Sequence, residues 1–316
     1  MTPTQNTAGY EFTWIVGADD TVTITGCKGS DRGVLEIPSM IEGKKVTRIG
    51  ESAFTLKNFR SVIIPEGVTF IGSYAFAYCA MKKIEIPDSV TRIGKAAFTG
   101  SGLTQLELPD GIVKIPSSLC SHCTKLQSVK FPKSVMLIGE FAFMGCAFPN
   151  LVIPDSVASI EQFAFSQCLM ESLTLPNGLE SIEMGAFEQC PYLTSVTIPD
   201  GVRMIKGRAF EECESLTSVV FPETESLIYI GEHAFYGCPL LTKPKISGMV
   251  YVESTAFNEE SPAMNEESPA MNEESTAMNE ESTAMNEESP AMNEESTAMN
   301  EESTAMNEES TAMNEV

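Results

Sequence analysis

Proline returns along this chain at intervals of 22 or 23 residues, after a first interval of 27, and an apolar residue precedes it in nine of the ten copies. Self-similarity at a period of about 20 to 50 residues is typical of solenoids, in which each repeat stacks on its neighbours. The full unit is L-x-x-V-x-I-P-x-x-V-x-x-I-G-x-x-A-F-x-x-C. Its prolines are Pro38, Pro65, Pro87, Pro109, Pro132, Pro154, Pro176, Pro199, Pro222 and Pro244. Its phenylalanines are Phe54, Phe76, Phe98, Phe143, Phe165, Phe187, Phe210, Phe235 and Phe257.

One copy, LTSVTIPDGVRMIKGRAFEEC at residues 193–213, indicates how a unit folds. Val196 and Ile198 are two residues apart and therefore point the same way on a strand. The following proline cannot donate to a strand ladder and ends the strand, and the Asp-Gly pair turns the chain. A second, very short strand is expected within Val202–Ile205. Residues 208–213 suit one short helical or 3₁₀ turn that places the alanine, phenylalanine and cysteine inward.

The predicted fold is an α/β solenoid of about ten units over residues 34–257. Strands of successive units are expected to be parallel and to stack roughly 4.8 Å apart, so that each apolar column runs the length of the solenoid. Two copies depart from the pattern. Leu119 and Cys120 replace the A-F step in one, and a two-residue insertion falls within Glu223–Ser226 in another.

Residues 1–33 are expected to form a leader and a cap, because a solenoid exposes its core at its first unit. Apolar residues alternate at period two within Tyr10–Gly26, around the turn residues Gly17–Asp20, which predicts a β-hairpin. Trp14 has two possible positions in this hairpin: against the end of the core, or on the outer face of the cap.

The heptad N-E-E-S-P/T-A-M repeats eight times in residues 258–316. Its apolar residues are adjacent instead of spaced as in a coiled coil, and prolines interrupt several copies. We therefore expect a disordered or transiently helical tail. Its glutamates could collect Ca²⁺ weakly, but no loop geometry holds the carboxylates together. A solubilising or spacing function is the preferred interpretation.

The formal net charge of −24 is concentrated in that tail, which holds 17 Glu and no Lys or Arg. Residues 1–257 therefore carry −24 + 17 = −7. An acidic surface argues against binding to nucleic acids or to anionic membranes, because both require clustered Lys and Arg. Residues 1–9 lack the pattern of a signal peptide, and no apolar run reaches the roughly 18 to 20 residues of a membrane span. A soluble chain without membrane insertion is expected.

Seven cysteines occupy the same position of the unit, which raises the possibility of a metal array or a disulfide ladder. The simpler interpretation is a small buried apolar residue in each unit. Lys57 and Ser101 replace the cysteine in two copies, and the total of nine is odd, so no complete disulfide framework is expected. The seven are Cys79, Cys123, Cys146, Cys168, Cys190, Cys213 and Cys238.

Residues 120–123, C-S-H-C, are the one local cluster that resembles a metal site, but tetrahedral zinc requires four ligands and the chain has only two histidines. His122 and His233 lie five repeats apart, and no G-x-S-x-G, P-loop or G-x-G-x-x-G motif is present. The carboxylates of Glu211 and Glu212 are interpreted as solvated charge. We therefore predict no catalytic residue, no metal and no cofactor, and a protein that is not an enzyme.

The outward positions of the main strand are the part that the repeat leaves free. We predict that they form a face for a protein partner, because solenoids use their exposed sheets in this way. The alternative is a solvated sheet that simply prefers β-branched and small polar residues. The first half of the face carries most of its charge. The candidate residues are Arg60, Lys82, Lys83, Glu85, Gln105, Glu107, Ser128, Lys130, Asn150, Ser172, Thr174, Ser195, Thr197 and Ser218.

The combination I-P-x-x-V-x-x-I-G-x-x-A-F-x-x-C resembles the BspA-like leucine-rich repeat family of bacterial and protist surface proteins. Residues Val68–Cys79 match it closely, and so do Val157–Cys168 apart from Glu161 in the glycine position. The resemblance covers residues 34–257. It implies a right-handed horseshoe or arc of stacked parallel strands, and a non-catalytic role in adhesion at cell surfaces, to host or matrix proteins or to other cells.

Two functional hypotheses follow. The first is adhesion or a host or matrix interaction through the exposed parallel sheet, as the resemblance implies. The alternative is an intracellular protein-interaction scaffold or effector, which the missing signal peptide and a column of free cysteines suited to a reducing compartment favour. In both cases the partner is a protein and the solenoid is expected to be a monomer. The localisation stays open between the cell surface and the cytoplasm.

Overall fold

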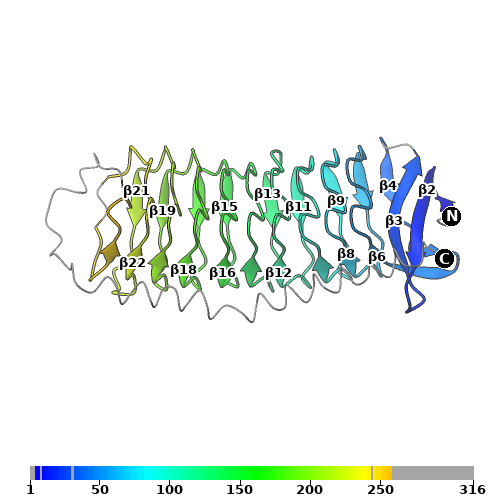
Figure 1. The fold of residues 1–316 in the computed structure, drawn as a ribbon, viewed down its shortest axis with the longest axis horizontal. Helices are drawn as coiled ribbons and strands as arrows, with labels where there is room; N and C mark the ends of the chain where they lie inside the picture. Colours follow the sequence, from blue (N-terminus) through cyan, green and yellow to red (C-terminus); the bar gives the residue numbers. More distant parts are fainter. Residues whose placement is uncertain (1–3, 8, 30–31, 243–244, 258–316) are drawn as a thin grey trace, which may run out of the picture. The chain divides into compact units, whose positions relative to one another are not determined.

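The computed structural model describes residues 4–7, 9–29, 32–242 and 245–257. The tail predicted for residues 258–316 and the last repeat proline, Pro244, lie outside the described residues. Within the described ranges the chain is a parallel-strand solenoid of about ten rungs, where a rung is one copy of the repeat (Figure 1). These ranges contain strands and turns but no helix, and so no helix that could cross a membrane.

Each rung begins with a three-residue main strand whose central side chain points into the core. The outer two side chains point away from it, because successive side chains of a strand alternate in direction. The main strands are β4 (Val34–Glu36), β7 (Ser61–Ile63), β9 (Lys83–Glu85), β11 (Gln105–Glu107), β13 (Ser128–Lys130), β15 (Asn150–Val152), β17 (Ser172–Thr174), β19 (Ser195–Thr197) and β21 (Ser218–Val220). Main strands pair in parallel, as predicted, within four short sheets: β4-β7-β9, β11-β13, β15-β17 and β19-β21.

A second row of parallel strands, two residues long except for β6 (Lys44–Ile49), follows the proline turn of each rung, and Figure 1 shows the two rows along opposite sides of the stack. The isoleucine or valine that ends each second strand points inward in nearly every rung, and the residue before it faces solvent. The second strands are β6 (Lys44–Ile49), β8 (Phe70–Ile71), β10 (Arg92–Ile93), β12 (Lys114–Ile115), β14 (Leu137–Ile138), β16 (Ser159–Ile160), β18 (Ser181–Ile182), β20 (Met204–Ile205), β22 (Tyr229–Ile230) and β23 (Tyr251–Val252).

The N-terminal segment is an antiparallel hairpin of β2 (Tyr10–Val16) and β3 (Val22–Gly29), with β1 (Thr4–Thr7) paired to β2. Strand β3 pairs in parallel with β6, and β5 (Met40–Ile41) forms a small antiparallel pair with β6. Of the two positions considered for Trp14, the structure shows the one against the core. Its side chain is 1% exposed within the core, so the hairpin contributes buried apolar surface to the first rungs.

The turn segment between the second strand and the cysteine is not helical, so the predicted short helical or 3₁₀ turn is wrong. In residues 206–213 the N–H groups of Arg208, Phe210 and Glu212 donate to carbonyls of the next rung, over 2.9, 2.8 and 2.7 Å. The N–H groups of Ala209 and Glu211 donate to the carbonyl three residues earlier, over 3.3 and 3.1 Å. Alternate amides therefore form tight turns and a third ladder between rungs.

This alternation requires left-handed backbone at two positions of each turn segment. Arg208 and Glu212 have φ values of 61° and 55°, and Tyr74 and Tyr78, at the same positions of an earlier rung, have 54° and 56°. Residues other than glycine adopt this region infrequently. A single helical turn would direct its N–H groups along its own axis and leave the first four without an acceptor inside the rung. The observed backbone instead directs half of these amides to the neighbouring rung, which stabilises the stack.

The repeat phenylalanines form stacked columns in the core, with each ring packed on the ring of the next rung. Phe143, Phe165 and Phe187 are fully buried, with successive ring centroids 5.4 and 5.7 Å apart and nearly parallel planes. At the irregular rung Cys120 takes the ring's place and is itself fully buried. The core therefore contains two ring columns, one on each side of Cys120.

All nine cysteines are buried free thiols, and the seven in the repeat position share one contact. Each donates its S–H to a carbonyl of the preceding rung, at the phenylalanine position. For Cys168 and the Phe143 carbonyl the distance is 3.1 Å. Burial raises the pKa of Cys168 to about 12. These thiols therefore act as hydrogen-bond donors that join adjacent rungs. The interpretation as small apolar residues did not include this function.

Candidate binding faces

The main-strand face consists of the outward side chains of the main strands, together with Arg60 and Lys82, which each precede a strand. The strand registers place its predicted residues opposite one another in three pairs of adjacent strands. Gln105 lies opposite Ser128, and Glu107 opposite Lys130. The predicted residues on β9 to β21 are all exposed, so the repeat leaves them available to a partner.

Charge is organised into ion pairs on the first half of this face. Lys83 and Glu85 lie on one strand with 2.7 Å between Nζ and Oε1, and about half of each side chain is exposed. Lys130 and Glu107 form a second ion pair across two adjacent strands. The hydrogen bond to Glu107, together with its negative charge, raises the pKa of Lys130. The two pairs present alternating charge that an oppositely patterned partner could match.

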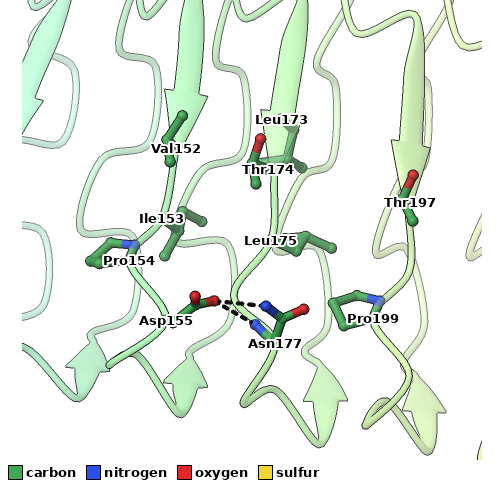
Figure 2. Close-up of a pocket in the computed structure, with 10 residues that line it drawn as sticks. All are labelled: Val152, Ile153, Pro154, Asp155, Leu173, Thr174, Leu175, Asn177, Thr197 and Pro199. Atoms are coloured by element: carbon green, nitrogen blue, oxygen red, sulfur yellow. Dashed lines mark hydrogen bonds between the residues drawn. The ribbon is translucent and has the colours of Figure 1, made fainter.

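The second half of the face is uncharged and contains a shallow groove of about 420 Å³. Figure 2 shows it across β15, β17 and β19, where short side chains leave the ends of the strands uncovered. At its base the backbone N–H and side-chain amide of Asn177 both donate to Asp155 Oδ1, over 3.0 and 3.2 Å. Its lining residues are Val152, Ile153, Pro154, Asp155, Leu173, Thr174, Leu175, Asn177, Thr197 and Pro199.

Next to the groove, Ser172 Oγ donates to Asn150 Oδ1 over 2.6 Å. Val152 is 67% exposed, which is high for a valine within a strand. The groove thus combines apolar walls with hydrogen-bonding groups that are already oriented, and it lies on the face that the sequence predicts for binding.

The cluster C-S-H-C of residues 120–123 does not converge on a point. Cys120 and Cys123 are fully buried, while His122 is exposed. Across the described part of the chain, no three side chains of His, Cys, Asp or Glu lie close enough to share a metal ion.

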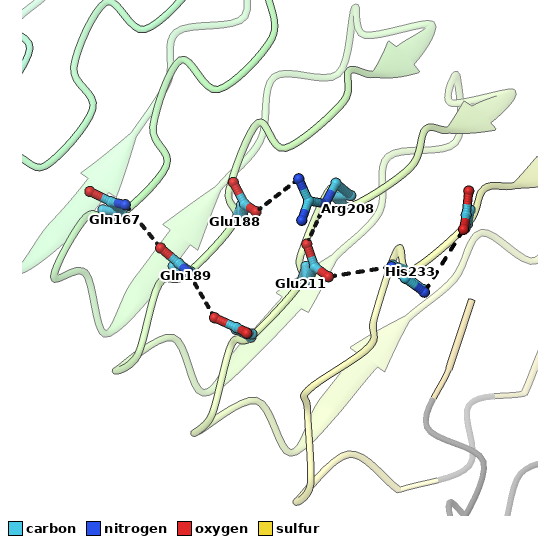
Figure 3. Close-up of polar contacts among 8 residues, drawn as sticks. Gln167, Glu188, Gln189, Arg208, Glu211 and His233 are labelled. Carbon is cyan, nitrogen blue, oxygen red and sulfur yellow. Dashed lines mark hydrogen bonds and ion pairs between the residues drawn. The ribbon is translucent and has the colours of Figure 1, made fainter. Parts of the chain in front are cut away.

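A charge cluster that sequence reasoning missed lies on the outer surface of the turn segments, and Figure 3 shows it. Glu211 has a side chain only 8% exposed, so its interpretation as solvated charge is wrong; Glu212 is the exposed one. Arg208 Nε lies 2.6 Å from Glu211 Oε2, and His233 Nδ1 lies 3.5 Å from Glu211 Oε1. The Glu211 carboxylate thus contacts two basic side chains, Arg208 of its own rung and His233 of the next rung.

Glu188 completes this cluster from the preceding rung, with its Oε1 3.8 Å from Arg208 Nη1. Burial and the neighbouring Glu211 carboxylate raise the pKa of Glu188, and Arg208 opposes that shift. Aligning the rungs reveals the signal in the sequence. Arg208 and His233 both precede the repeat alanine, and Glu188 and Glu211 both follow the repeat phenylalanine, so the four fall on adjacent columns.

Glu161 provides a pH-dependent prediction, because it occupies the repeat's glycine position. Burial raises the pKa of its carboxyl, although Oε2 accepts a hydrogen bond from Glu140 N over 2.9 Å. A raised carboxyl pKa means that the folded state binds a proton more readily than the unfolded state, so this group lowers stability as pH rises above about 4.5. We expect Glu161→Gln to increase the free energy of unfolding at pH 7 by less than about 1 kcal/mol.

Urea unfolding of Glu161→Gln at pH 7 and pH 4 measures this effect. The gain in unfolding free energy should shrink toward pH 4, where the Glu161 carboxyl of the unsubstituted protein becomes protonated in both the folded and the unfolded state. Glu171→Gln removes the same charge from an exposed position and is the matched control. An equal gain for both variants at pH 7 would attribute the effect to net charge alone.

Comparison with known proteins adds to this geometry. The family model described as "BspA type Leucine rich repeat region (6 copies)" matches residues 47–147 and 136–263. No curated protein matches the chain. Among solved structures, a leucine-rich repeat protein from Bacteroides ovatus has a TM-score of 0.56 at 26% identity, over 76% of this chain and 60% of that one. The chain thus spans less than two thirds of that protein.

Two further structures share the fold. The pneumococcal vaccine antigen PcpA has a TM-score of 0.55 at 18% identity, over 77% of this chain and 81% of its own. A leucine-rich repeat protein from Eubacterium ventriosum has a TM-score of 0.52 at 18% identity, over 86% and 97%. The family match extends over more than half of the chain and agrees with the stacked rungs described above. The chain therefore belongs to the BspA-type leucine-rich repeat family.

Proposed function

We propose that this chain is a non-catalytic protein-binding solenoid that engages its partner through the main-strand face. The observation that carries the proposal is the contrast between the two sides of each main strand. Inward positions repeat the same apolar residue types in every rung, whereas the outward positions change from charged pairs to uncharged side chains beside a groove. The core explains the inward side chains, and partner binding is the function that the outward ones support best.

The second part of the proposal is adhesion at a cell surface, to host or matrix proteins. Membership of the family supports it. The alternative is an intracellular scaffold, and the buried free thiols favour a reducing compartment. Labelling intact cells with a membrane-impermeant amine reagent distinguishes the two. A protease added to intact cells gives a second readout. Protein that is labelled and digested supports adhesion, and protein protected from both the amine reagent and the protease contradicts it.

Charge reversal on the first half of the main-strand face tests the site. We expect a variant with Lys83→Glu, Glu85→Lys, Glu107→Lys and Lys130→Glu to lose at least about tenfold in affinity, because reversing several charges of one contact costs more than about 1.4 kcal/mol. Pull-down of partners followed by binding titration measures the loss. Each ion pair is swapped rather than broken, so the thermal midpoint should change little.

The groove supplies the second arm of the same test. Thr174→Arg and Thr197→Arg place long cationic side chains over it and leave the ion pairs intact. Loss of binding in this variant alone would locate the contact in the uncharged half. Unchanged binding in both variants, with both proteins folded, would remove the main-strand face as the binding site.

A further inference from the structure

The groove of the main-strand face lies in a part of the chain that contains no basic side chain. Residues 134–202 hold eight Asp and Glu and no Lys, Arg or His. The three strands that form the groove, β15, β17 and β19, all fall within this range. A surface that carries one sign of charge raises the local concentration of the opposite charge. The surroundings of the groove therefore favour a cationic ligand.

Asp155 supplies one of these carboxylates at the base of the groove, as Figure 2 shows. Its Oδ1 accepts both hydrogen bonds from Asn177, and its Oδ2 has no hydrogen-bond or ion-pair partner within the described residues. The side chain is exposed. A carboxylate that is already fixed by two hydrogen bonds loses little freedom on binding. A Lys or Arg side chain can therefore donate a charge-assisted hydrogen bond to an oriented oxygen.

The other charged groups around the groove leave an excess of negative charge. Glu171 directly precedes β17, and Asp200 holds the position of Asp155 two rungs further on; both are exposed. Lys133 holds that position in the preceding rung, but no ion pair joins it to Asp155. Lys130 of β13 is already paired with a glutamate of β11. A cation from a partner would therefore find three carboxylates and one unpaired lysine.

The walls of the groove supply apolar surface beside this charge. Val152 is 67% exposed, and Ile153, Leu173 and Leu175 line the groove although they are largely buried. Strands β17 and β19 belong to separate sheets, so the groove crosses an interruption of main-strand pairing. Its volume of about 420 Å³ falls within the range of ligand clefts in proteins. The groove therefore has room for an apolar side chain next to the carboxylate.

We propose that the groove binds an extended segment of the protein partner in which an apolar residue and a Lys or Arg stand two positions apart. This rests on the proposed function of the main-strand face and names the chemistry of its partner. Side chains two positions apart on an extended chain point the same way, roughly 6.6 to 6.8 Å from one another. The apolar side chain contacts Val152 and the leucines of β17, and the basic one pairs with Asp155 Oδ2.

Other classes of ligand fit the groove less well. Nucleic acids and anionic membranes require clustered Lys and Arg, and residues 134–202 have none. An acidic peptide would meet Asp155 without a compensating cation among the lining residues. Those residues also include no aromatic ring on which a sugar could stack. A basic and apolar peptide is the ligand that the charge and the walls favour together.

Synthetic peptides test the proposal on the full chain. The probe is fluorescein-labelled (Leu-Ser-Arg-Ser)₃, in which every Leu and Arg points to one side of an extended chain. Of the comparison peptides, (Leu-Ser-Gln-Ser)₃ lacks the charge and (Ser-Ser-Arg-Ser)₃ lacks the apolar side chains. Fluorescence anisotropy measures each Kd at about 0.15 M salt, where a Debye length of about 8 Å limits attraction by the overall negative charge of the chain.

The groove variant is Val152→Ser with Asp155→Asn. The second change keeps an oxygen for the two Asn177 hydrogen bonds and removes only the charge. The matched control is Val220→Ser with Asp88→Asn, which makes the same replacements at the same repeat positions outside the groove. Val220 is 56% exposed and Asp88 is exposed, so the core needs neither side chain. Circular dichroism establishes that each variant is folded.

We expect the Kd of the probe to rise about tenfold in the groove variant and less than about twofold in the control. Asp155→Asn alone should raise it about threefold and leave the Kd of (Leu-Ser-Gln-Ser)₃ unchanged, because only the arginine peptide uses the charge. Equal losses in the groove and control variants would overturn the proposal, and so would equal Kd values for the three peptides. Tighter binding of maltohexaose, a neutral oligosaccharide, would overturn the choice of a peptide ligand.

The captured partner separates this proposal from the proposed function. If Thr174→Arg with Thr197→Arg abolishes partner binding but the probe does not compete with the partner, the main-strand face stands and the basic and apolar ligand is wrong. If partner binding survives both this variant and the charge reversal, the face is not the binding site, and the proposal for the groove falls with it.

Discussion

Replacing Phe165 with Ala is expected to lower the free energy of unfolding by about 3 to 5 kcal/mol, the range for deleting a buried aromatic ring from a packed core. The Phe165 ring is fully buried between those of Phe143 and Phe187, with centroids 5.4 and 5.7 Å away. Its loss leaves a cavity that both neighbouring rungs line, and rigid stacking prevents those rungs from collapsing into it. Equilibrium denaturation in urea measures the change.

The same rung provides the matched control, because Phe163 is an aromatic residue that the core does not need. Its ring stacks on that of Phe141 at 5.3 Å, but on the partly exposed outer surface of the turn segments. We expect Phe163→Ala to cost about 1 kcal/mol, as for an aromatic pair near solvent. If both variants lost the same stability, the repeat phenylalanines would not be the core.

The second large effect is expected at Gly94, where two rungs approach closely. A Cβ at this position would lie 2.4 Å from Ser73 N and 2.8 Å from Gly72 C, both of them backbone atoms that cannot move independently. Gly94→Ala must therefore push two rungs apart, and we expect a cost of about 2 to 3 kcal/mol from overpacking. Thermal unfolding followed by circular dichroism measures it.

Gly111→Ala is the control for this substitution. Its Cβ would lie 3.2 Å from the nearest atom, the methyl group of Thr91, and it stands in the exposed turn after the repeat proline. We expect a change within about 0.5 kcal/mol. A large loss at Gly111, or none at Gly94, would show that close packing of the rungs does not depend on glycine.

The sequence was sufficient for the stacking direction and for the core. Val196 and Ile198 are separated by one residue and lie directly before a proline. This pattern specifies a strand that buries one side and ends at the proline. Repetition at 22 or 23 residues then forces neighbouring strands to be parallel. The same alignment predicted which main-strand residues face solvent, because a strand has only two sides.

The backbone conformation of the turn segment could not be predicted, because the residue types in most rungs do not indicate a left-handed conformation. At the two left-handed positions of a turn segment some rungs have glycine, such as Gly100 and Gly185, which suggests the conformation. Other rungs have Tyr74, Tyr78 or Arg208, which are ordinary helix-compatible residues. Interaction with the next rung, through ladder hydrogen bonds, imposes the left-handed backbone on them.

The burial of Glu211 was missed for a related reason. Considered alone, Glu211 and Glu212 are two consecutive acids on a surface turn. Their difference arises from their neighbours: Arg208 of the same rung and His233 of the next rung lie against Glu211, whereas Gln189 of the preceding rung donates to Glu212 over 2.7 Å. Two of these three contacts join residues more than 20 positions apart, so a local motif does not show which acid is solvated.

The cysteine contacts have a consequence for how such a chain can change its length. Each rung that has the repeat cysteine supplies a thiol to the rung before it, and it receives the next thiol at its phenylalanine-position carbonyl, as Cys168 and Phe165 show. A duplicated block of 22 or 23 residues therefore brings its own complete set of junctions, and the flanking blocks need no compensating substitutions. Each such duplication would lengthen the main-strand face by roughly 4.8 Å. Gene duplication within one reading frame could in this way adjust the reach of the binding surface in equal steps.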